Sequence, residues 1–349
     1  MLWVDEYRPK ELNDITYHKE GGRKLAELVK SGDFPHLLIY GPEGAGKRTR
    51  IHCLLKELYG SGADTVQLVS RNFQTVSGKK LDITCVSSNY HIELTPSDVG
   101  IYDRVVVQEI IKQAAETFNL EMVAQKPFKV VVLMEADNLT KDAQHTLRRT
   151  MEKYAGSCKL ILCCQSVTKV IDPLRSRCMV IRVPAPSDND ISDALKRVVS
   201  KEQINVRDRM IEQIVEKSNG NMRRALLLLE STHNQYSAIL DTQKVAVPEW
   251  EEYLKETAQL MIRTQNPDTL LKVRQRMYEM LCRCIPTEVL FVRLLDELLP
   301  NCEAKIRGEV IAAAAKFEHS HNLGSKDIYH LDAFVATFMH IYATNRAGQ

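Results

Sequence analysis

The chain has 349 residues, of which 44% are hydrophobic and 26% charged, as in ordinary soluble globular proteins of two or three domains. No apolar run approaches the ~20 residues needed to cross a bilayer, and the N-terminal stretch MLWVDEYRPKELNDI has no apolar core, so we expect neither a membrane segment nor a signal or transit peptide. The formal net charge is only +2, which requires any surface for nucleic acid to be local.

The first predicted unit is a strand that runs into a glycine-rich loop. Residues 36–40, HLLIY, are apolar and are followed at once by GPEGAGK. The next segment, TRIHCLLKELYG, carries Ile51, Leu54 and Leu58 at helical spacing and stops at Gly60. Strand, glycine turn and helix in this order are the context in which such a loop indicates a phosphate site.

Strands and helices continue to alternate after this loop. The predicted elements are a hairpin over 66–76 and 79–86, a helix over 103–118, a strand over 128–134, a helix over 140–154 and strands over 159–164 and 178–183. The strand at 128–134 is β-branched and apolar apart from Lys129, as a central parallel strand should be, and we expect the strands at 159–164 and 178–183 to be buried as well. The alternation predicts a doubly wound α/β domain with its ligand at the carboxyl ends of the strands.

Beyond VPAPSDND (183–190) only helical periodicity remains. Helices are predicted over 190–201, 208–218 and 221–233, and then over about 249–343 with breaks near Pro267, Pro286, Pro300 and Gly324. We therefore expect three domains: an α/β nucleotide-binding domain over 1–184, a small helical domain over 185–240 and a helical C-terminal domain over 241–349.

The glycine loop departs from a standard phosphate-binding loop at one position. In such loops, backbone N–H groups and a helix N-terminus surround the phosphates. The residue after the lysine normally holds Mg²⁺ through a hydroxyl, but here it is Arg48, and Thr49 lies about 100° further around the helix. The expected nucleotide contacts in the loop are Gly41, Pro42, Glu43, Gly44, Ala45, Gly46, Lys47, Arg48 and Thr49.

The second metal contact is also missing. It normally comes from an Asp at the end of a buried strand, but this strand ends VVVLMEAD, with Met134 at that position. Glu135 follows, where a residue would orient an attacking water, and Asp137 falls on the other face if the strand continues. We expect a site that holds ATP or ADP, holds Mg²⁺ weakly or not at all, and hydrolyses poorly with Glu135 idle.

The cysteines argue against a zinc site. The nine cysteines are scattered, and none forms a CxxC pair. A structural zinc ion needs four ligands at workable spacing. Free thiols in a reducing compartment, the cytosol or nucleus, fit better, and we expect no metal site.

Several stretches together resemble the small subunits of replication factor C, the eukaryotic sliding-clamp loader of the AAA+ family. They are LWVDEYRPKELNDI, FPHLLIYGPEGAGK, SNYHIELTPSD, LTKDAQHTLRRTMEKY, LRSRCMVIRVPAPS and GNMRRALLLLE. The resemblance runs from about residue 2 to residue 343. The altered glycine loop and strand end make the chain most similar to the subunit type described as catalytically silent. The resemblance implies an AAA+ domain, a lid domain and an all-α collar that joins subunits.

The resemblance also assigns residues to the nucleotide pocket. Tyr7, Arg8 and Pro9 would line the adenine side. Arg223 would be the second sensor. Gln165 stands where the first sensor Asn is expected, which further weakens hydrolysis at this subunit's own site.

Arg177, in Ser176-Arg177-Cys178, is implied to be an arginine finger that acts on the ATP of a neighbouring subunit. Such a planar cation neutralises transition-state charge and is worth about 10³–10⁵ in rate in related NTPases. Arg149 is a second candidate for contact with the neighbouring nucleotide. The alternative for Arg149 is an exposed position paired with Glu152.

The resemblance implies three kinds of partner: other replication factor C subunits in a hetero-pentamer, the sliding clamp PCNA, and primer–template DNA held by its backbone in the nucleus. The DNA candidates lie at two helix N-termini and are Arg104, Thr140, as an N-cap, and Lys141. The clamp would face the helix at 103–118 and the loop at 119–127.

Two other functions stay open from the sequence. The chain could be a catalytically active AAA+ ATPase in which Arg48 replaces part of the metal's charge. It could also be a nucleotide-independent assembly scaffold with a vestigial loop. Metal-dependent turnover by the isolated chain would favour the former, and absence of nucleotide after gentle purification the latter.

Overall fold

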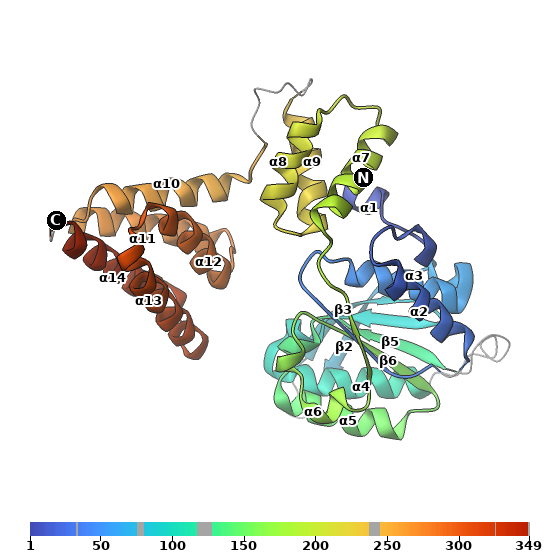
Figure 1. Cartoon of the computed structure of the whole chain (residues 1–349). Helices are drawn as coiled ribbons and strands as arrows, with labels where there is room; N and C mark the ends of the chain where they lie inside the picture. Colours follow the sequence, from blue (N-terminus) through green and yellow to red (C-terminus); the bar gives the residue numbers. More distant parts are fainter. Residues whose placement is uncertain (33, 75–79, 117–127, 237–244, 325, 348–349) are drawn as a thin grey trace. The chain divides into compact units, whose positions relative to one another are not determined.

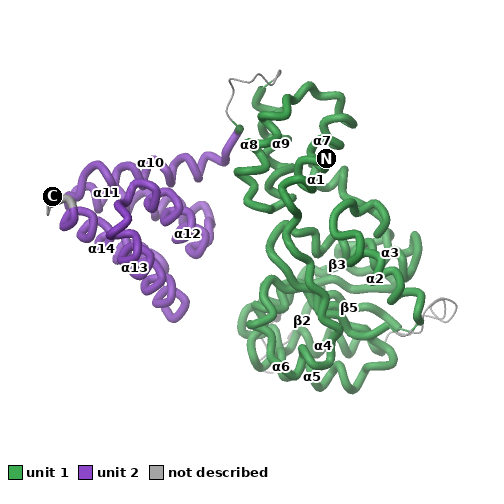
Figure 2. Tube along the Cα trace, viewed as in Figure 1, with its two compact units in different colours: residues 1–245 green, residues 246–349 purple. Residues whose placement is uncertain are grey.

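The computed structural model describes residues 1–32, 34–74, 80–116, 128–236, 245–324 and 326–347. They form two compact units, Met1–Val245 and Ala246–Gln349 (Figure 2). The predicted boundary at 240/241 and the predicted clamp-facing loop at 119–127 lie outside the described residues. Within those residues, no helix combines the length and the apolar character needed to cross a membrane.

Unit 1 contains a seven-stranded sheet in the order β2-β3-β4-β5-β6-β1-β7. The strands are β1 (Leu37–Tyr40), β2 (Gln67–Gln74), β3 (Lys80–Ser87), β4 (His91–Leu94), β5 (Lys129–Leu133), β6 (Cys158–Cys164) and β7 (Met179–Arg182). The five strands from β4 to β7 in this order are parallel, and β2 and β3 form the predicted antiparallel hairpin at one edge. The predicted α/β fold is confirmed.

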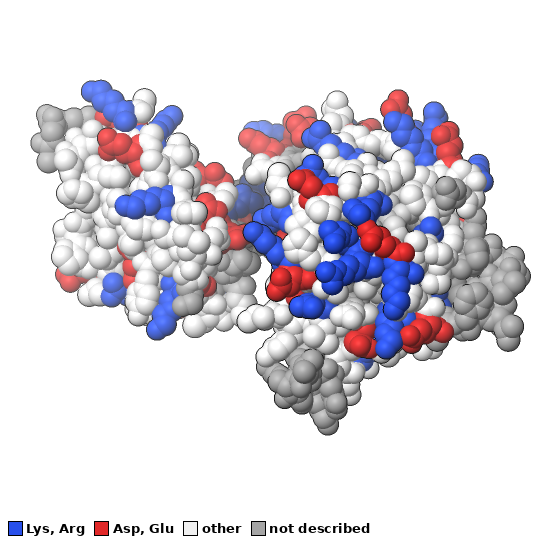
Figure 3. Space-filling view, turned by 90° about the horizontal axis from the view of Figure 1, so that it is seen from below, with Lys and Arg blue, Asp and Glu red and all other residues white. Residues whose placement is uncertain are grey.

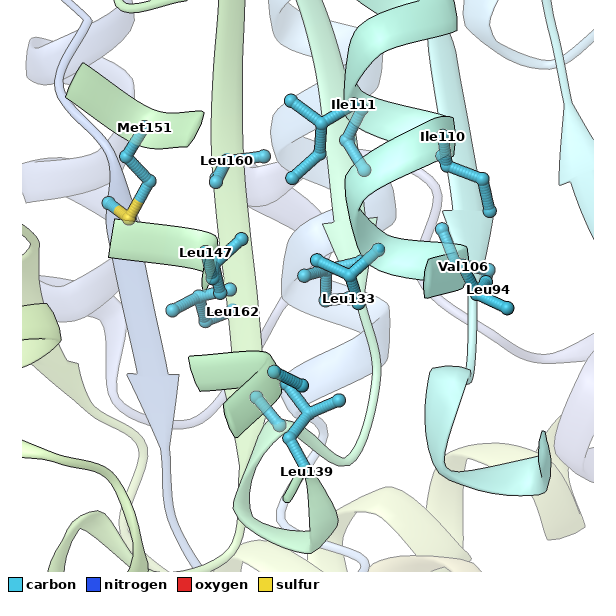
Figure 4. Close-up of a cluster of buried hydrophobic side chains, with 14 of the residues drawn as sticks. Leu94, Val106, Ile110, Ile111, Leu133, Leu139, Leu147, Met151, Leu160 and Leu162 are labelled. Carbon is cyan, nitrogen blue, oxygen red and sulfur yellow. The ribbon is translucent and has the colours of Figure 1, made fainter. Parts of the chain in front are cut away.

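Helices cover both faces of the sheet (Figure 1). They are α2 (Lys19–Lys30) and α3 (Lys47–Tyr59) on one face and α4 (Asp103–Glu116), α5 (Lys141–Lys153) and α6 (Asp172–Arg175) on the other. Because side chains alternate along a strand, Leu37 and Ile39 pack toward α2 and α3, while Leu38 packs toward α4 and α5. Figure 4 shows part of this second core, with Leu133 of β5 and Leu147 of α5 among its labelled side chains.

One predicted feature of the sheet is wrong. The strand at 178–183 was expected to be buried, but β7 is an edge strand, and Met179 and Val180 are 44% and 43% exposed. An edge strand has a neighbouring strand on one side only, so an apolar composition does not ensure that its side chains are buried. Three α-helices and one strand of unit 1 were not predicted: α1 (Trp3–Glu6), α2, α6 and β4.

A three-helix bundle completes unit 1. It consists of α7 (Asp188–Lys201), α8 (Asp208–Ser218) and α9 (Met222–Gln235), and Ser187 begins it with a capping box to Asp190. Trp3 from the N-terminus is buried in the core of this bundle, and its backbone N–H donates to Glu230 at 3.1 Å. The N-terminal segment therefore packs with the bundle, although the predicted boundary places it with the α/β domain.

Unit 2 is entirely helical in its described residues. Its helices are α10 (Glu249–Arg263), α11 (Pro267–Cys282), α12 (Thr287–Leu298), α13 (Ala304–Leu323) and α14 (Asp327–Ala347). The predicted breaks hold: Pro267 begins α11, Pro286 caps α12 and Gly324 ends α13. The core is centred on Phe291, Phe334 and Phe338, each fully buried.

Candidate functional site

A pocket of about 730 Å³ lies at the carboxyl ends of the parallel strands. Its size is within the range of small-ligand sites. Its walls come from the N-terminal segment, the glycine loop with the first turn of α3, the loops after β4, β5 and β6, and helices α7 and α9. Segments that are distant in sequence thus meet at the edge where parallel sheets bind ligands.

The glycine loop has the predicted shape. Gly44 and Gly46 have φ angles of 69° and 82°, a backbone conformation that residues with a side chain rarely adopt. Gly46 is also the N-cap of α3. The Lys47 Nζ donates to the carbonyl oxygens of Gly41 and Pro42 at 2.7 and 2.8 Å. Of the nine loop residues predicted to contact nucleotide, six line the pocket: Glu43, Gly44, Gly46, Lys47, Arg48 and Thr49. The other three, Gly41, Pro42 and Ala45, do not line it.

The loop is fixed by close contacts on two sides. A methyl group at Gly44 would lie 1.8 Å from the Oδ1 of Asn221, the residue that caps α9, and one at Gly46 would lie 2.2 Å from the Tyr17 hydroxyl. The Tyr17 hydroxyl also donates to the Ala45 carbonyl at 3.1 Å. The conformation of the loop is therefore tied to the position of α9.

Arg48 makes an ion pair that the sequence did not predict. Its Nη2 lies 2.7 Å from Oε1 of Glu93 on β4, whose side chain is 4% exposed. Burial raises the pKa of Glu93, and the nearby Arg48 guanidinium opposes that rise. His52 Nε2 lies 3.6 Å from the other carboxylate oxygen, and burial lowers the pKa of His52 to about 4. The sequence signal for this ion pair was an acidic residue, Glu93, between the apolar residues Ile92 and Leu94.

The chain turns sharply where the acidic strand end was predicted. The strand β5 stops at Leu133, and Glu135 has a φ of 51° before the short 3-10 helix Ala136–Asn138. Because the strand does not continue, Asp137 is not on its opposite face: it lines the same pocket as Met134 and Glu135. The Asp137 carboxylate accepts from the backbone N–H of Gln165 at 3.1 Å.

The two positions that usually hold a magnesium ion carry side chains that do not fit it. Mg²⁺ requires oxygen ligands in octahedral geometry. The Arg48 guanidinium stands at the position of the usual hydroxyl and the Met134 thioether at that of the usual carboxylate, and a guanidinium repels a divalent cation. In the part of the chain that the structure describes, no group of three or more His, Cys, Asp and Glu side chains is arranged to hold a metal.

The residues predicted for the adenine side and the two predicted sensor residues line the same pocket. They are Tyr7, Arg8, Pro9, Gln165 and Arg223. The Tyr7 hydroxyl donates to the carboxylate of Glu202, and this hydrogen bond is the main reason that the pKa of Tyr7 rises to about 12. The N-terminal segment is thus joined to the end of α7 beside the pocket.

Arg177 lies away from this pocket, between α6 and β7. Its Nε and Nη2 lie 2.7 and 2.6 Å from Oε1 of Glu152 on α5, and its Nη1 donates to the Pro173 carbonyl at 2.9 Å. Glu152 therefore pairs with Arg177, and its suggested pairing with Arg149 is wrong. Arg149 is exposed on α5.

A buried glutamine holds the segment that leads to Arg177. The Gln144 side chain is 1% exposed, and its amide nitrogen donates to the carbonyls of Leu139 and Lys169 at 3.1 and 3.2 Å. Its oxygen accepts from the backbone N–H of Ile171 at 2.9 Å. Gln144 therefore fixes the path between β6 and α6 to the start of α5, a role that the sequence pattern did not reveal.

The two predicted DNA-facing helix N-termini are joined by one carboxylate. Thr140 is the N-cap of α5, as predicted, and accepts from the Ala143 backbone N–H at 3.2 Å. Asp103, at the start of α4 and 1% exposed, accepts from both the backbone N–H and the hydroxyl of Thr140. Arg104 and Lys141 are exposed. Lys and Arg side chains gather, with acidic ones among them, on the lower face of unit 1 (Figure 3).

Comparisons with known proteins cover nearly the whole chain. Residues 250–346 match the family "Replication factor C subunit 3, C-terminal domain", residues 193–233 match "RCF1/5-like, AAA+ ATPase lid domain", and residues 17–187 match "DNA polymerase III, delta subunit". The chain is 52% identical to replication factor C subunit 3 of Bos taurus over 98% of this chain and 96% of that one. It is 51% identical to the Homo sapiens subunit 3 over the same shares, and 42% identical to subunit 5 of Schizosaccharomyces pombe over 100% and 98%.

The solved structures show a likeness of fold. The Thermotoga maritima RuvB Holliday junction branch migration motor matches with a TM-score of 0.50 and 16% sequence identity. The match covers 73% of this chain and 79% of that one. At this identity the likeness concerns the fold alone.

Proposed function

The chain belongs to the family of replication factor C subunits 3 and 5, and on that premise we propose that it is a small subunit of the clamp loader, which opens the ring-shaped sliding clamp and loads it onto primer–template DNA. In this role it binds ATP or ADP with little or no hydrolysis of its own. Arg177 acts on the ATP bound by the neighbouring subunit. The domain boundaries proposed above, at 184/185 and 240/241, separate nucleotide-binding, lid and collar domains.

The pocket supports the nucleotide part of this proposal. The loop's backbone and Lys47 provide the groups that hold phosphates, and Tyr7, Arg8 and Arg223 lie in the same cavity. Three substitutions favour weak hydrolysis. Arg48 replaces a hydroxyl residue, Met134 replaces an Asp, and Gln165 replaces the shorter sensor Asn. The observation that carries the proposal is this combination of an intact phosphate loop with a lost metal seat.

The position of Arg177 supports its action on another subunit. It lies outside its own nucleotide pocket, at the surface between α6 and the edge strand β7, with 39% of its side chain exposed. Its ion pair with Glu152 is exposed, and such pairs are worth only about 0–1 kcal/mol. A neighbouring nucleotide can therefore displace Glu152 at little cost.

Family membership is the support for the proposed partners. We propose that the partners are other replication factor C subunits in a hetero-pentamer, the clamp PCNA and primer–template DNA, in the nucleus. Arg104 and Lys141 are the proposed DNA contacts, since they are exposed at two joined helix N-termini. The Thr140 hydroxyl already donates to Asp103, so Thr140 would contribute as a cap.

The test is clamp- and DNA-stimulated ATP hydrolysis by the reconstituted five-subunit complex, with Arg177→Ala or Glu135→Gln in this subunit only. Arg175→Ala is the matched control, because Arg175 lies in the same segment and pairs with Asp172 at 2.9 Å. We expect Arg177→Ala to remove a large share of turnover and the other two variants to change little. If Glu135→Gln is the damaging variant, the chain hydrolyses its own nucleotide and the proposal fails.

A further inference from the structure

We propose that this site binds its nucleotide without a divalent metal, and that Arg48, held by the buried carboxylate of Glu93, supplies the cation that Mg²⁺ supplies in related sites. The inference rests on the proposed nucleotide site and extends it. It concerns binding alone and assigns no catalytic role to Arg48.

The first support is the position of Arg48 in the chain. It directly follows Lys47 in the first turn of α3, where the hydroxyl that holds Mg²⁺ is normally found, and it lines the pocket together with Lys47 and Met134. A cation fixed at this position excludes a second, divalent cation and can take its place beside the phosphates. Arginine is suited to this, since its planar fork donates to phosphate oxygens in pairs.

The second support is the way in which Arg48 is held. Its Nη2 lies 2.7 Å from Oε1 of Glu93, and Glu93 belongs to β4, where it is opposite Val132 of β5. In a standard site an acidic residue at the end of β5 holds the metal. Here that position is Met134, and the buried carboxylate comes from the adjacent strand. In a standard site a carboxylate holds the metal, and the metal holds the phosphate. Here the carboxylate of Glu93 on the adjacent strand would hold the Arg48 guanidinium, and the guanidinium would hold the phosphate.

The third support is the contrast between the two partners' environments. The Glu93 side chain is 4% exposed, whereas 47% of the Arg48 side chain is exposed. A buried carboxylate needs a partner, so Glu93 holds the guanidinium from the buried side of the ion pair. Among the residues that the structure describes, Glu93 is the charged partner of Arg48. The other N–H groups of the guanidinium thus remain available to phosphate oxygens.

The experiment measures the affinity of the full chain for fluorescent ADP, once with excess Mg²⁺ and once with excess EDTA. We expect the two dissociation constants of the wild-type chain to agree within about threefold, against the tenfold or larger differences that a lost ligand worth about 1.4 kcal/mol would produce. In Arg48→Ser we expect binding in EDTA to weaken by about tenfold or more. Glu93→Gln, which keeps shape and removes the anchoring charge, should give an intermediate loss.

The control is Arg23→Ser, which removes an exposed arginine on α2 outside the pocket and should leave both dissociation constants unchanged. If the wild-type chain binds ADP only with Mg²⁺, the inference is overturned and the nucleotide site stands. If it binds without Mg²⁺ but Arg48→Ser binds as tightly, the role of Arg48 is overturned. If the chain binds no ADP under either condition, the proposed nucleotide site itself fails, and the inference with it.

Discussion

The carboxylate of Asp103 accepts two hydrogen bonds from Thr140, one from the backbone N–H at 2.7 Å and one from the hydroxyl at 2.9 Å. Asp103 begins α4 and Thr140 caps α5, so one buried side chain connects the N-termini of two helices. The negative charge also lies where the helix dipoles favour it. The exposed groups at these ends, Arg104 and Lys141, are thereby held in a fixed relation to each other.

Removal of this connection should destabilise unit 1. We expect Asp103→Ala to lower the free energy of unfolding by about 1–3 kcal/mol, because it leaves the N–H and hydroxyl of Thr140 without their acceptor. Urea denaturation of the full chain measures this. Asp142→Ala, an exposed change in the first turn of α5, should cost less than about 1 kcal/mol. Equal losses in the two variants would contradict a connecting role for Asp103.

Release of Arg177 from Glu152 should not impair its proposed function. We expect Glu152→Ala to leave ATP turnover of the reconstituted complex at the wild-type level or to raise it by up to about fivefold, since an exposed ion pair of at most about 1 kcal/mol no longer competes. Asp172→Ala, which breaks the neighbouring pair with Arg175, is the control. A loss as large as that of Arg177→Ala would instead mean that Glu152 positions the guanidinium for action.

The contact between the glycine loop and α9 predicts an epistatic pair. Gly44→Ala should weaken ADP binding, because an alanine is strained at a φ of 69° and its methyl group would displace the Asn221 side chain. The strain costs about 1–2 kcal/mol, and loss of the α9 cap about 0.5–2 kcal/mol more. Asn221→Ser keeps a capping hydroxyl in less space and should recover part of the loss.

Thermal unfolding and ADP titration of the single and double variants measure this coupling. Gly156→Ala is the matched control, since a methyl group there meets no atom within 4 Å and the backbone is not left-handed. If the double variant is no better than Gly44→Ala alone, the contact with Asn221 does not explain the need for glycine.

Burial of His91 predicts a loss of stability in mild acid. Burial lowers its pKa from 6.5 to about 4, so between these values the unfolded chain binds a proton that the folded chain does not. Stability from this group is therefore complete above pH 6.5 and falls as the pH drops toward 4, by an amount on the order of 3 kcal/mol.

His91→Asn provides the test. An asparagine can keep the hydrogen bond that joins the His91 Nδ1 to the Ser88 hydroxyl at 2.8 Å, but it does not take up a proton. Urea denaturation between pH 4.5 and 7 should show a flatter dependence for the variant than for the wild-type chain. His36 and His52, whose pKa values are also lowered to about 4, leave a residual slope. If the stabilities of the variant and of the wild-type chain depend on pH in the same way, the lowered pKa of His91 is not a source of the acid sensitivity.

Segments with a clear apolar pattern were predictable from the sequence, whereas segments without one were not. The strand β5 shows a continuous apolar run, and the inner face of α5 shows a helical spacing. Helix α2 begins Lys-Glu-Gly-Gly, and two glycines at a helix start lower the propensity on which a prediction depends. Strand β4 lacks an apolar run, because two of its four residues, His91 and Glu93, are polar although they are buried. The burial of β7 depends on its place in the sheet, which composition does not specify.

The candidate site divides in the same way. The glycine loop was predictable because its backbone geometry requires glycine at fixed positions. The partner of Arg48 was not, because Glu93 meets it only once β4 lies beside β5. The turn at Glu135 was hidden for a different reason: a left-handed glutamate has no sequence signature, and the pocket position of Asp137 depends on it.

The burial of Trp3 in the α7–α9 core has a consequence for synthesis of the chain. The acceptor of its N–H, Glu230, lies 227 residues further along. At translation rates of about 5–20 residues per second, the N-terminus waits roughly 10–45 s after it is made before that acceptor exists. Tyr7, which lines the pocket, likewise cannot form its hydrogen bond until Glu202 has been synthesised. The α/β strands can pair during this interval, so the nascent protein has a sheet before it has a closed ligand site, and an indole ring remains in water meanwhile.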